Sequence, residues 1–225
     1  MGTLFIVATP IGNMSDISKR AVEVLSKVDV VFAESTRTAS KLYQLLGLPP
    51  KKLIQFNEHT EEKLISEILK LLVTGGDIAL ISESGTPLIS DPGFKLVRAC
   101  RNNNIKVSPI PGANAAIATI SASGLPTDKF LFLGFLPKSQ GKKAKLLNKI
   151  KTIRENLPIV LIIYENPNRL EKSLREIRDV LGNMDACIGL EVTKKFESFE
   201  IGKLDSVILK LKGKKIKGEV TIVIG

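Results

Sequence analysis

Residues Ile78 to Gly93 form an apolar run that passes into a loop of Ser, Gly and Pro and then into a helix start. The run Ile78 to Ile81 has no polar residue, which is typical of a strand buried on both faces. Asp91 and Pro92 indicate a helix start. The side chain of an Asp at the N-cap accepts a hydrogen bond from a backbone amide of the first turn, and Pro is tolerated at N1. The ten residues from Ser82 to Asp91 are long for such a connection. Ligands bind beyond the carboxyl ends of parallel strands, so we interpret this segment as a binding loop, with a rigid surface turn as the alternative.

The order of strand and helix recurs along the first half of the chain. Apolar runs at 3–8, 28–33, 52–56 and 106–110 predict further strands, and amphipathic segments between them predict helices. This alternation predicts an α/β fold with a mostly parallel sheet. A helix of small residues from Asn114 to Ser123 follows, and strands and helices continue less regularly. We expect a domain boundary near residues 111 to 116, and therefore two domains, 1–111 and 112–225.

The positive charge of the chain is unevenly distributed. The 225 residues carry a net charge of +10. Residues 1–111 contain 13 Lys and Arg against 11 Asp and Glu, whereas residues 112–225 contain 20 against 12. A basic half favours a polyanionic partner, with nucleic acid first and an anionic membrane second. Lysines on exposed helices also serve solubility, and a chain with no Trp and two Tyr offers few platforms for base stacking.

The composition is that of a globular protein, with 44% hydrophobic and 25% charged residues. Cys100 and Cys187 lie in apolar segments and form no CxxC pair, so neither a disulfide framework nor a metal site is expected. The apolar start, Met1 to Ala8, lacks a basic flank and is too short for a signal peptide or a membrane span. We expect a cytoplasmic protein without a membrane partner.

Seven polar segments each follow a predicted strand, so polar groups on them can converge at the edges where parallel strands end. No Walker A or Rossmann glycine pattern is present, and His59 has no nucleophile motif beside it, which makes a structural histidine the simpler interpretation. Glu34 and Arg37 either pair on one helical turn or act in a site. The seven segments are 9–14, 34–38, 57–60, 82–91, 111–115, 164–169 and 191–195.

Five of the motifs together resemble the RsmI family of the tetrapyrrole methylase superfamily. They are Thr9-Pro-Ile-Gly-Asn13, Ala33-Glu-Ser-Thr-Arg37, Ser84-Gly-Thr-Pro-Leu-Ile-Ser-Asp-Pro-Gly93, Pro111-Gly-Ala-Asn114 and Gly134-Phe-Leu-Pro137, in the family's order and spacing. The resemblance extends from about Leu4 to Gly225. It implies methylation of a cytidine ribose 2′-hydroxyl in small-subunit ribosomal RNA, with S-adenosylmethionine as the methyl donor.

The resemblance also implies two α/β domains, the first with a mostly parallel and the second with a mixed sheet, a cofactor cleft between them, and a homodimer. By motif position, the residues expected to bind the cofactor are Pro10, Ile11, Ser84, Gly85, Thr86, Pro87, Ile89, Asp91, Ala113, Asn114, Ala115, Tyr164, Leu190 and Val220.

Two departures from the wider pattern refine this expectation. The porphyrin branch of the superfamily has a glycine-rich first loop, and Thr9 to Asn13 does not, which argues against a tetrapyrrole substrate. Many RsmI-like proteins continue into a small C-terminal extension, whereas this sequence ends at Gly225. RNA binding is therefore expected to depend on the basic second half or on the dimer.

The reaction needs a base for the hydroxyl proton and alignment of the hydroxyl with the methyl group. Alignment can lower the activation barrier by about 7 to 11 kcal/mol. Glu34, His59 and Lys194 are the candidate bases, since each lies in a loop that follows a strand. The cations Arg37, Arg169, Lys194 and Lys195 are candidates for holding RNA phosphates, with ordinary surface charge as the alternative.

Two other functions fit the same sequence. One is methylation of a protein or a small molecule by another branch of the superfamily, for example in the manner of diphthine synthase. The other is binding of ribosomal RNA without catalysis. Transfer of a methyl group to RNA, to protein or to neither distinguishes them.

Overall fold

The computed structural model describes residues 1–225, which divide into two compact units, Met1–Asn114 and Ala115–Gly225. Each unit is built on one five-stranded sheet. None of the helices combines the length and the apolar character that crossing a membrane requires.

The sheet of the first unit is entirely parallel, in the order β3-β2-β4-β1-β5, as predicted. β4 lies at its centre and all four of its residues are buried, which explains its uninterrupted apolar sequence. The strands are β1 (Thr3–Val7), β2 (Val30–Ala33), β3 (Lys52–Gln55), β4 (Ile78–Ile81) and β5 (Lys106–Ile110).

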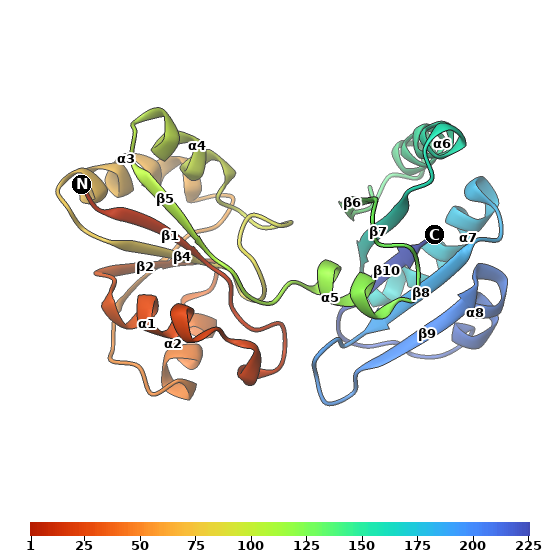
Figure 1. Cartoon of the computed structure of the whole chain (residues 1–225), viewed down its shortest axis with the longest axis horizontal. Helices are drawn as coiled ribbons and strands as arrows, with labels where there is room; N and C mark the ends of the chain where they lie inside the picture. The colour runs from red at the N-terminus through yellow and green to blue at the C-terminus, as the bar shows by residue number, and fades with distance from the viewer. The chain divides into compact units, whose positions relative to one another are not determined.

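Helices cover both faces of this sheet (Figure 1). One core contains residues of α1 (Lys19–Lys27) and α2 (Thr36–Leu45), and the other contains residues of α3 (Glu61–Val73) and α4 (Phe94–Asn102). A 3-10 turn, Met14–Asp16, precedes α1. The helices that follow β1 and β2 thus lie on the opposite face from those that follow β3 and β4. In sheets of this kind, ligands bind beyond the carboxyl ends of the strands where the connections change face, which here is next to β4.

The second unit contains a mixed sheet in the order β6-β7-β10-β8-β9, as the resemblance implies. β6 and β7 are parallel, and the other neighbours are antiparallel. β6 continues through Gly134 to Phe135, so the motif that begins at Gly134 starts within the strand, where the pairing with β7 is irregular. The strands are β6 (Phe130–Phe135), β7 (Val160–Glu165), β8 (Asp185–Leu190), β9 (Ser198–Lys203) and β10 (Val220–Ile224).

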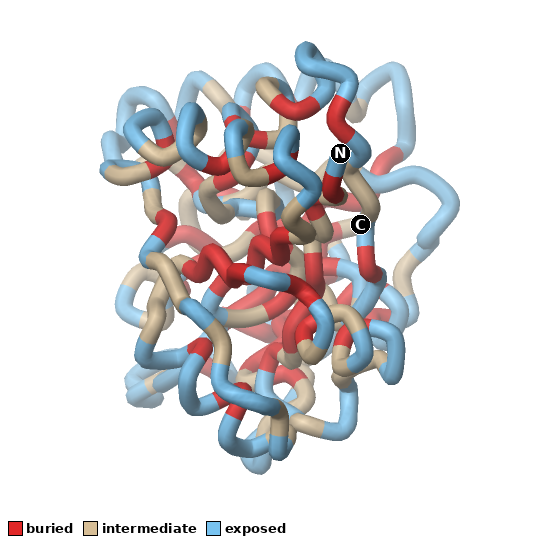
Figure 2. The backbone as a smooth tube through the Cα atoms, turned by 90° about the vertical axis from the view of Figure 1, so that its left-hand side faces the viewer, coloured by how far each residue is buried: buried red, intermediate tan, exposed pale blue.

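The helices of the second unit also lie on two faces of their sheet. The short helix α5 (Ala115–Ala122) packs on one face through Ala116 and Ile120. The other face is covered by α6 (Gln140–Asn156), α7 (Leu170–Leu181) and α8 (Leu204–Leu211). A 3-10 turn, Pro167–Arg169, leads into α7 and is capped by the side chain of Asn166, which accepts from the amide of Asn168. Figure 2 shows the buried segments in the interior and the exposed ones on the outer turns.

Candidate functional site

The segment after β4 is anchored to the loop that follows β1, its neighbour in the sheet, and to the loop that follows β5, the strand on the far side of β1. The backbone amides of Thr9 and Gly85 donate to each other's carbonyl oxygens, at 2.8 and 3.1 Å, and form an isolated antiparallel bridge. The hydroxyl of Thr86 donates to the carbonyl of Ala113 at 3.1 Å. Three of the predicted motifs of the first unit are therefore in direct contact.

Within this segment the chain turns sharply. Leu88 and Ser90 have φ angles of 72° and 69°, and Gly85 and Gly93 have φ angles of 79° and 129°. Side chains other than glycine rarely adopt this left-handed region, and strained residues of this kind cluster at ligand sites. Together with the anchors on the neighbouring loops, these bends fix the backbone conformation of the segment.

The predicted helix start at Asp91 and Pro92 is wrong. α4 begins at Phe94, after Gly93, and has no cap from the preceding side chain. Its first amides are instead capped by Glu61 of α3, whose Oε1 accepts from the backbone nitrogens of Lys95 at 3.0 Å and Leu96 at 3.2 Å. Because Glu61 performs the capping, the carboxylate of Asp91 is not used for it.

Asp91 belongs to an acidic group at the carboxyl edge of the sheet. The pKa of Asp91 is raised to about 6, first by burial and then by the charges of Glu34 and Glu83, while a hydrogen bond from Ser82 acts in the opposite direction. The pKa of Glu34 is also raised, first by burial and then by Glu83 and Glu58. Carboxylates crowded in this way are stabilised by a cationic ligand. No group of three or more His, Cys, Asp or Glu side chains is arranged to hold a metal ion.

We expect Asp91→Asn to stabilise the protein at pH 7 by about 1 to 2 kcal/mol, a value reduced for the partial exposure of the carboxyl group. The folded pKa lies above the unfolded value, so the folded state binds the proton more strongly. The unfolding free energy of the wild type therefore falls as the pH rises from about 4 to about 6, and that of the variant does not share this fall. Urea unfolding at pH 4.5 and 7 measures the difference. The same pH dependence in both proteins contradicts it.

The other predicted residues of the first unit differ in their placement. Glu34 is half-buried, and its Oε2 accepts from the backbone amide of Glu83 at 3.4 Å, which brings it to the segment after β4. Arg37 is exposed on α2, and the charges acting on Glu34 are those of Glu83 and Glu58, so the alternative of a Glu34–Arg37 ion pair is not found. His59 is exposed in the turn before α3, where its amide donates to the side chain of Asn57.

In the second unit, predicted cofactor residues lie together at one end of the three central strands, β7, β10 and β8. Val220 lies directly opposite Leu190 in the ladder, and the neighbouring Thr221 lies opposite Tyr164. The hydroxyl oxygen of Tyr164 accepts from the backbone amide of Ala116 at 3.2 Å, next to Ala115 at the start of α5.

Lys194 is held in an ion-pair network at this end of the strands. Its Nζ lies 2.9 Å from Oε1 of Glu191 and 3.3 Å from Oε2 of Glu219, and the amide of Glu219 donates to Glu191 at 2.8 Å. Partial burial alone lowers the pKa of Lys194, but the two carboxylates outweigh it and raise the pKa. A lysine held protonated is a poor base. The loop is bent sharply, with φ angles of 50° at Glu191 and 67° at Thr193.

Arg169 and Lys195 occupy different environments. The guanidinium of Arg169 contacts both oxygens of the buried Glu165, at 3.0 and 3.1 Å, and donates to the carbonyl of Leu136 at 2.8 Å. These contacts engage Arg169 within the unit. Lys195 is exposed, with its Nζ 5.7 Å from the centre of the Phe196 ring.

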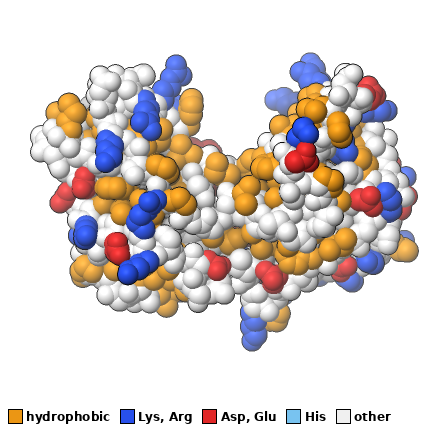
Figure 3. Space-filling view, viewed as in Figure 1, with side chains coloured by type: hydrophobic (Ala, Val, Ile, Leu, Met, Phe, Trp, Pro, Cys, Tyr) orange, Lys and Arg blue, Asp and Glu red, His pale blue; other side chains and the backbone are white.

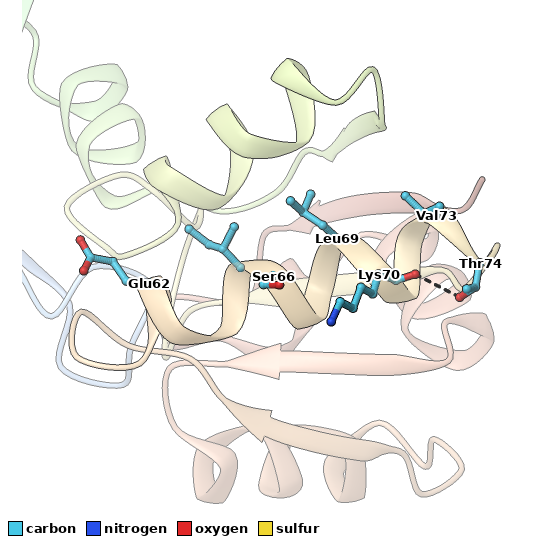
Figure 4. A pocket seen from close by; sticks show the side chains of 7 residues that line it. Glu62, Ser66, Leu69, Lys70, Val73 and Thr74 are labelled. Atoms are coloured by element: carbon cyan, nitrogen blue, oxygen red, sulfur yellow. Dashed lines mark hydrogen bonds between the residues drawn. The ribbon is translucent and has the colours of Figure 1, made fainter.

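Two hollows lie on the first unit. A cavity of about 130 Å³ adjoins the segment after β4 and is lined by Pro10, Ser82 and Glu83, among others, together with the exposed face of α2. An open groove runs along α3, lined by Ile65, Leu69 and Val73 with polar residues at its sides (Figure 4). Only the first hollow contains motif residues.

Sequence reasoning missed several contacts at the two sheet edges. Thr9 and Ser82 were not singled out as site residues, although the backbone of Thr9 pairs with that of Gly85 and the hydroxyl of Ser82 donates to the carbonyl of Ser84 at 3.1 Å. Phe132 and Phe135 pack on the ring of Tyr164, with centroids 4.9 and 5.7 Å apart. Phe135 lies within the Gly134–Pro137 motif, which was a usable signal.

Comparison with known proteins identifies relatives over the whole chain. Residues 3–208 match the family described as Tetrapyrrole (Corrin/Porphyrin) Methylases. Proteins named Ribosomal RNA small subunit methyltransferase I are similar throughout. The one from Thermotoga maritima is 40% identical and covers 100% of this chain and 98% of its own. The one from Halalkalibacterium halodurans is 40% identical and covers 99% of this chain and 75% of its own. The one from Pseudomonas aeruginosa is 47% identical and covers 88% of this chain and 68% of its own.

Solved structures share the fold at much lower identity. Diphthine synthase gives a TM-score of 0.74 at 14% identity, covering 100% of this chain and 90% of its own. Uroporphyrin-III C-methyl transferase from Thermus thermophilus, complexed with S-adenyl homocysteine, gives a TM-score of 0.66 at 16% identity, covering 100% and 97%. At these identities the likeness establishes the fold alone.

Proposed function

Because the chain belongs to the ribosomal RNA small subunit methyltransferase I family, within the tetrapyrrole methylases, we propose that it methylates the ribose 2′-hydroxyl of a cytidine in small-subunit ribosomal RNA. The observation that carries this proposal is identity of 37% to 47% to proteins of that name, over 88% or more of the chain. Family membership makes the chain a ribosomal RNA methyltransferase that uses S-adenosylmethionine. The cytidine and its 2′-oxygen are the proposed part.

The residues after β4 fit S-adenosylmethionine by their chemistry. This cofactor supplies a methyl group activated by a sulfonium, and its ammonium adds a second positive charge. The raised pKa values of Asp91 and Glu34 mark a site where a cation is favourable. Backbone and hydroxyl groups of the anchored turn offer polar contacts beside the apolar Pro10, Ile11 and Pro87. We therefore retain these residues as cofactor contacts, with Ser84, Gly85, Thr86, Ile89, Ala113 and Asn114.

The contacts assigned to the second unit are part of the same proposal. Tyr164, Leu190 and Val220 lie at one end of three neighbouring strands. Ala115 begins α5, beside the amide that donates to Tyr164. Their proximity to one another supports a shared role in holding one ligand.

Among the three candidate bases, Glu34 is the best supported. It alone contacts the segment after β4, and its raised pKa brings its proton affinity closer to that useful for a general base at neutral pH. Lys194 is held protonated by Glu191 and Glu219, and His59 is exposed in a turn. We propose that Glu34 takes the proton of the 2′-hydroxyl as the oxygen attacks the methyl group.

The family resemblance further supports a homodimer that acts in the cytoplasm, where ribosomal subunits are assembled. Sedimentation at micromolar concentration tests the dimer. A species with the mass of one chain, 24.5 kDa, contradicts it.

Methyl transfer to a panel of acceptors tests the proposed substrate class. Tritium-labelled S-adenosylmethionine is incubated with the protein and with small ribosomal subunits lacking the modification, their naked RNA, or total ribosomal protein. We expect label in RNA from at least one of the first two. Label in protein favours the branch that resembles diphthine synthase, and cofactor binding without transfer to any acceptor favours a non-catalytic RNA-binding protein.

A further inference from the structure

The exposed face of α6 carries lysines that no acidic residue neutralises. Lys142, Lys145 and Lys149, here called the α6 lysine row, are exposed and form no ion pair. The buried Lys143 on the same helix does pair, with Glu176 at 2.6 Å. Lys and Arg side chains are visible over α6 in Figure 3.

Within the second unit, the charges of α6 are arranged differently from those of the neighbouring helix, although unpaired lysines also occur elsewhere in the unit. Most of its acidic side chains pair with a nearby Lys or Arg, as Asp185 does with Lys203 at 2.9 Å. The neighbouring helix α7 mixes its charges, with Glu171 and Arg175 2.7 Å apart at positions i and i+4. A helix that needs charge only for solubility has this mixed pattern. α6 has no acidic residue before Glu155.

The row also opposes the stability of its own helix. The first turn of α6 contains no acidic residue, and Ser139 makes no side-chain cap bond. Lysines near the positive end of a helix dipole are unfavourable, and Lys145 and Lys149 are like charges at i and i+4. An anion bound along this face offsets both the unfavourable interaction with the helix dipole and the repulsion between the lysines. The charge pattern of α6 is therefore more favourable when a polyanion is bound than when the face is exposed to solvent.

The spacing suits a nucleic-acid strand. The intervals of three and four residues place the lysines about 4.5 and 6 Å apart along the helix axis, on one side of it. Between Gly141 and Thr152 the exposed residues are Gly, Lys, Asn, Ala and Thr, and the one exposed large apolar side chain of α6, Ile153, follows the lysines toward the C-terminal end of the helix, so the row has no apolar face of the kind that inserts into a lipid surface. Because the helix is packed through Leu147 and Ile150, the charges are carried on a fixed support.

We propose that the α6 lysine row binds the phosphate backbone of the substrate RNA, each lysine contacting a different phosphate. This inference rests on the proposed function for the identity of the polyanion. It assigns RNA binding to residues other than Arg37, Arg169, Lys194 and Lys195, of which Arg169 and Lys194 are engaged by carboxylates.

The test compares two triple variants that remove the same charge from the same unit. One is Lys142→Gln, Lys145→Gln and Lys149→Gln. The matched control is Lys212→Gln, Lys215→Gln and Lys217→Gln, from an exposed irregular segment whose three lysines also form no ion pair. Gln and Lys have similar helix propensities, so α6 is expected to remain folded, as circular dichroism verifies.

The probe is a fluorescent transcript of small-subunit ribosomal RNA, and Kd is measured at several KCl concentrations. For the α6 triple variant we expect Kd to rise on the order of tenfold near 0.1 M salt and the salt slope to fall by about 2, as the loss of three phosphate contacts implies. The control is expected to change Kd less than about twofold. Lys→Arg at the three α6 positions should keep the affinity.

Equal weakening in the two triple variants overturns the proposal, because net charge alone then explains the binding. The proposal is also overturned if the salt dependence of Kd is unchanged in the α6 triple variant. It is likewise overturned if this variant loses binding to anionic vesicles but still binds RNA as the wild type does. Failure of the proposed function is distinguishable, since a wild type that transfers no methyl group to RNA is detected without any of these variants.

Discussion

Replacing Glu34 with Gln lowers kcat for methyl transfer by about 10² to 10⁴-fold, the usual contribution of a general base. Gln keeps the size of the side chain and can still accept from the amide of Glu83, but it cannot take a proton. Binding of S-adenosylmethionine, measured by calorimetry, should change far less than kcat. A variant with wild-type kcat removes Glu34 from the mechanism.

The pH dependence separates a base from a structural carboxylate. In the wild type, kcat rises with pH as Glu34 loses its proton, and this rise occurs above the usual pH range of a Glu because burial raises its pKa. Glu34→Gln lacks this limb. The control Glu83→Gln removes a neighbouring negative charge that raises the pKa of Glu34. In this variant the rise of kcat with pH should therefore occur at lower pH, and the maximal kcat should be largely retained.

Replacing Glu165 with Ala destabilises the protein by about 3 to 5 kcal/mol, the cost of leaving a buried charge without its partner. The side chain of Glu165 is fully buried, and its oxygens accept from Arg169, from the hydroxyl of Ser173 at 2.6 Å and from the amide of Asn166 at 2.7 Å. Its loss leaves the Arg169 guanidinium without a counter-ion. Urea unfolding measures the change.

The matched control is Glu171→Ala, in the same region. Glu171 and Arg175 have the same i and i+4 spacing as Glu165 and Arg169, but their side chains are 42% and 43% exposed. Exposed pairs of this kind contribute about 0.3 to 0.5 kcal/mol, so the control should lose no more than about that. Equal losses in the two variants contradict the assignment of Glu165 as a buried anchor.

The elements set by local pattern were predictable from the sequence. β4 and β5 have the predicted bounds, because an apolar run is a pattern that acts within a short window of the sequence. The parallel sheet followed from strand and helix alternation. The carboxyl edge of that sheet, and with it the contact of Glu34 with the segment after β4, followed from topology.

What could not be predicted depends on residues far apart in the chain. Asp91 reads as a helix cap, yet Glu61 caps α4 from about thirty residues away, and no local pattern reveals this. Lys194 reads as a free cation, yet Glu219 and Glu191 bind it from another strand and from its own loop. The pair of Glu165 and Arg169 was within reach, since its i and i+4 spacing is visible in the sequence.

The most direct test of the account is the identity of the methylated nucleoside. Small ribosomal subunits lacking the modification are labelled from S-adenosylmethionine by the wild-type protein, and their RNA is digested to nucleosides and separated by mass. We expect label in 2′-O-methylcytidine, and no such label when Glu34→Gln replaces the wild type. Label on a base, or on the ribose of another nucleoside, contradicts the proposed acceptor.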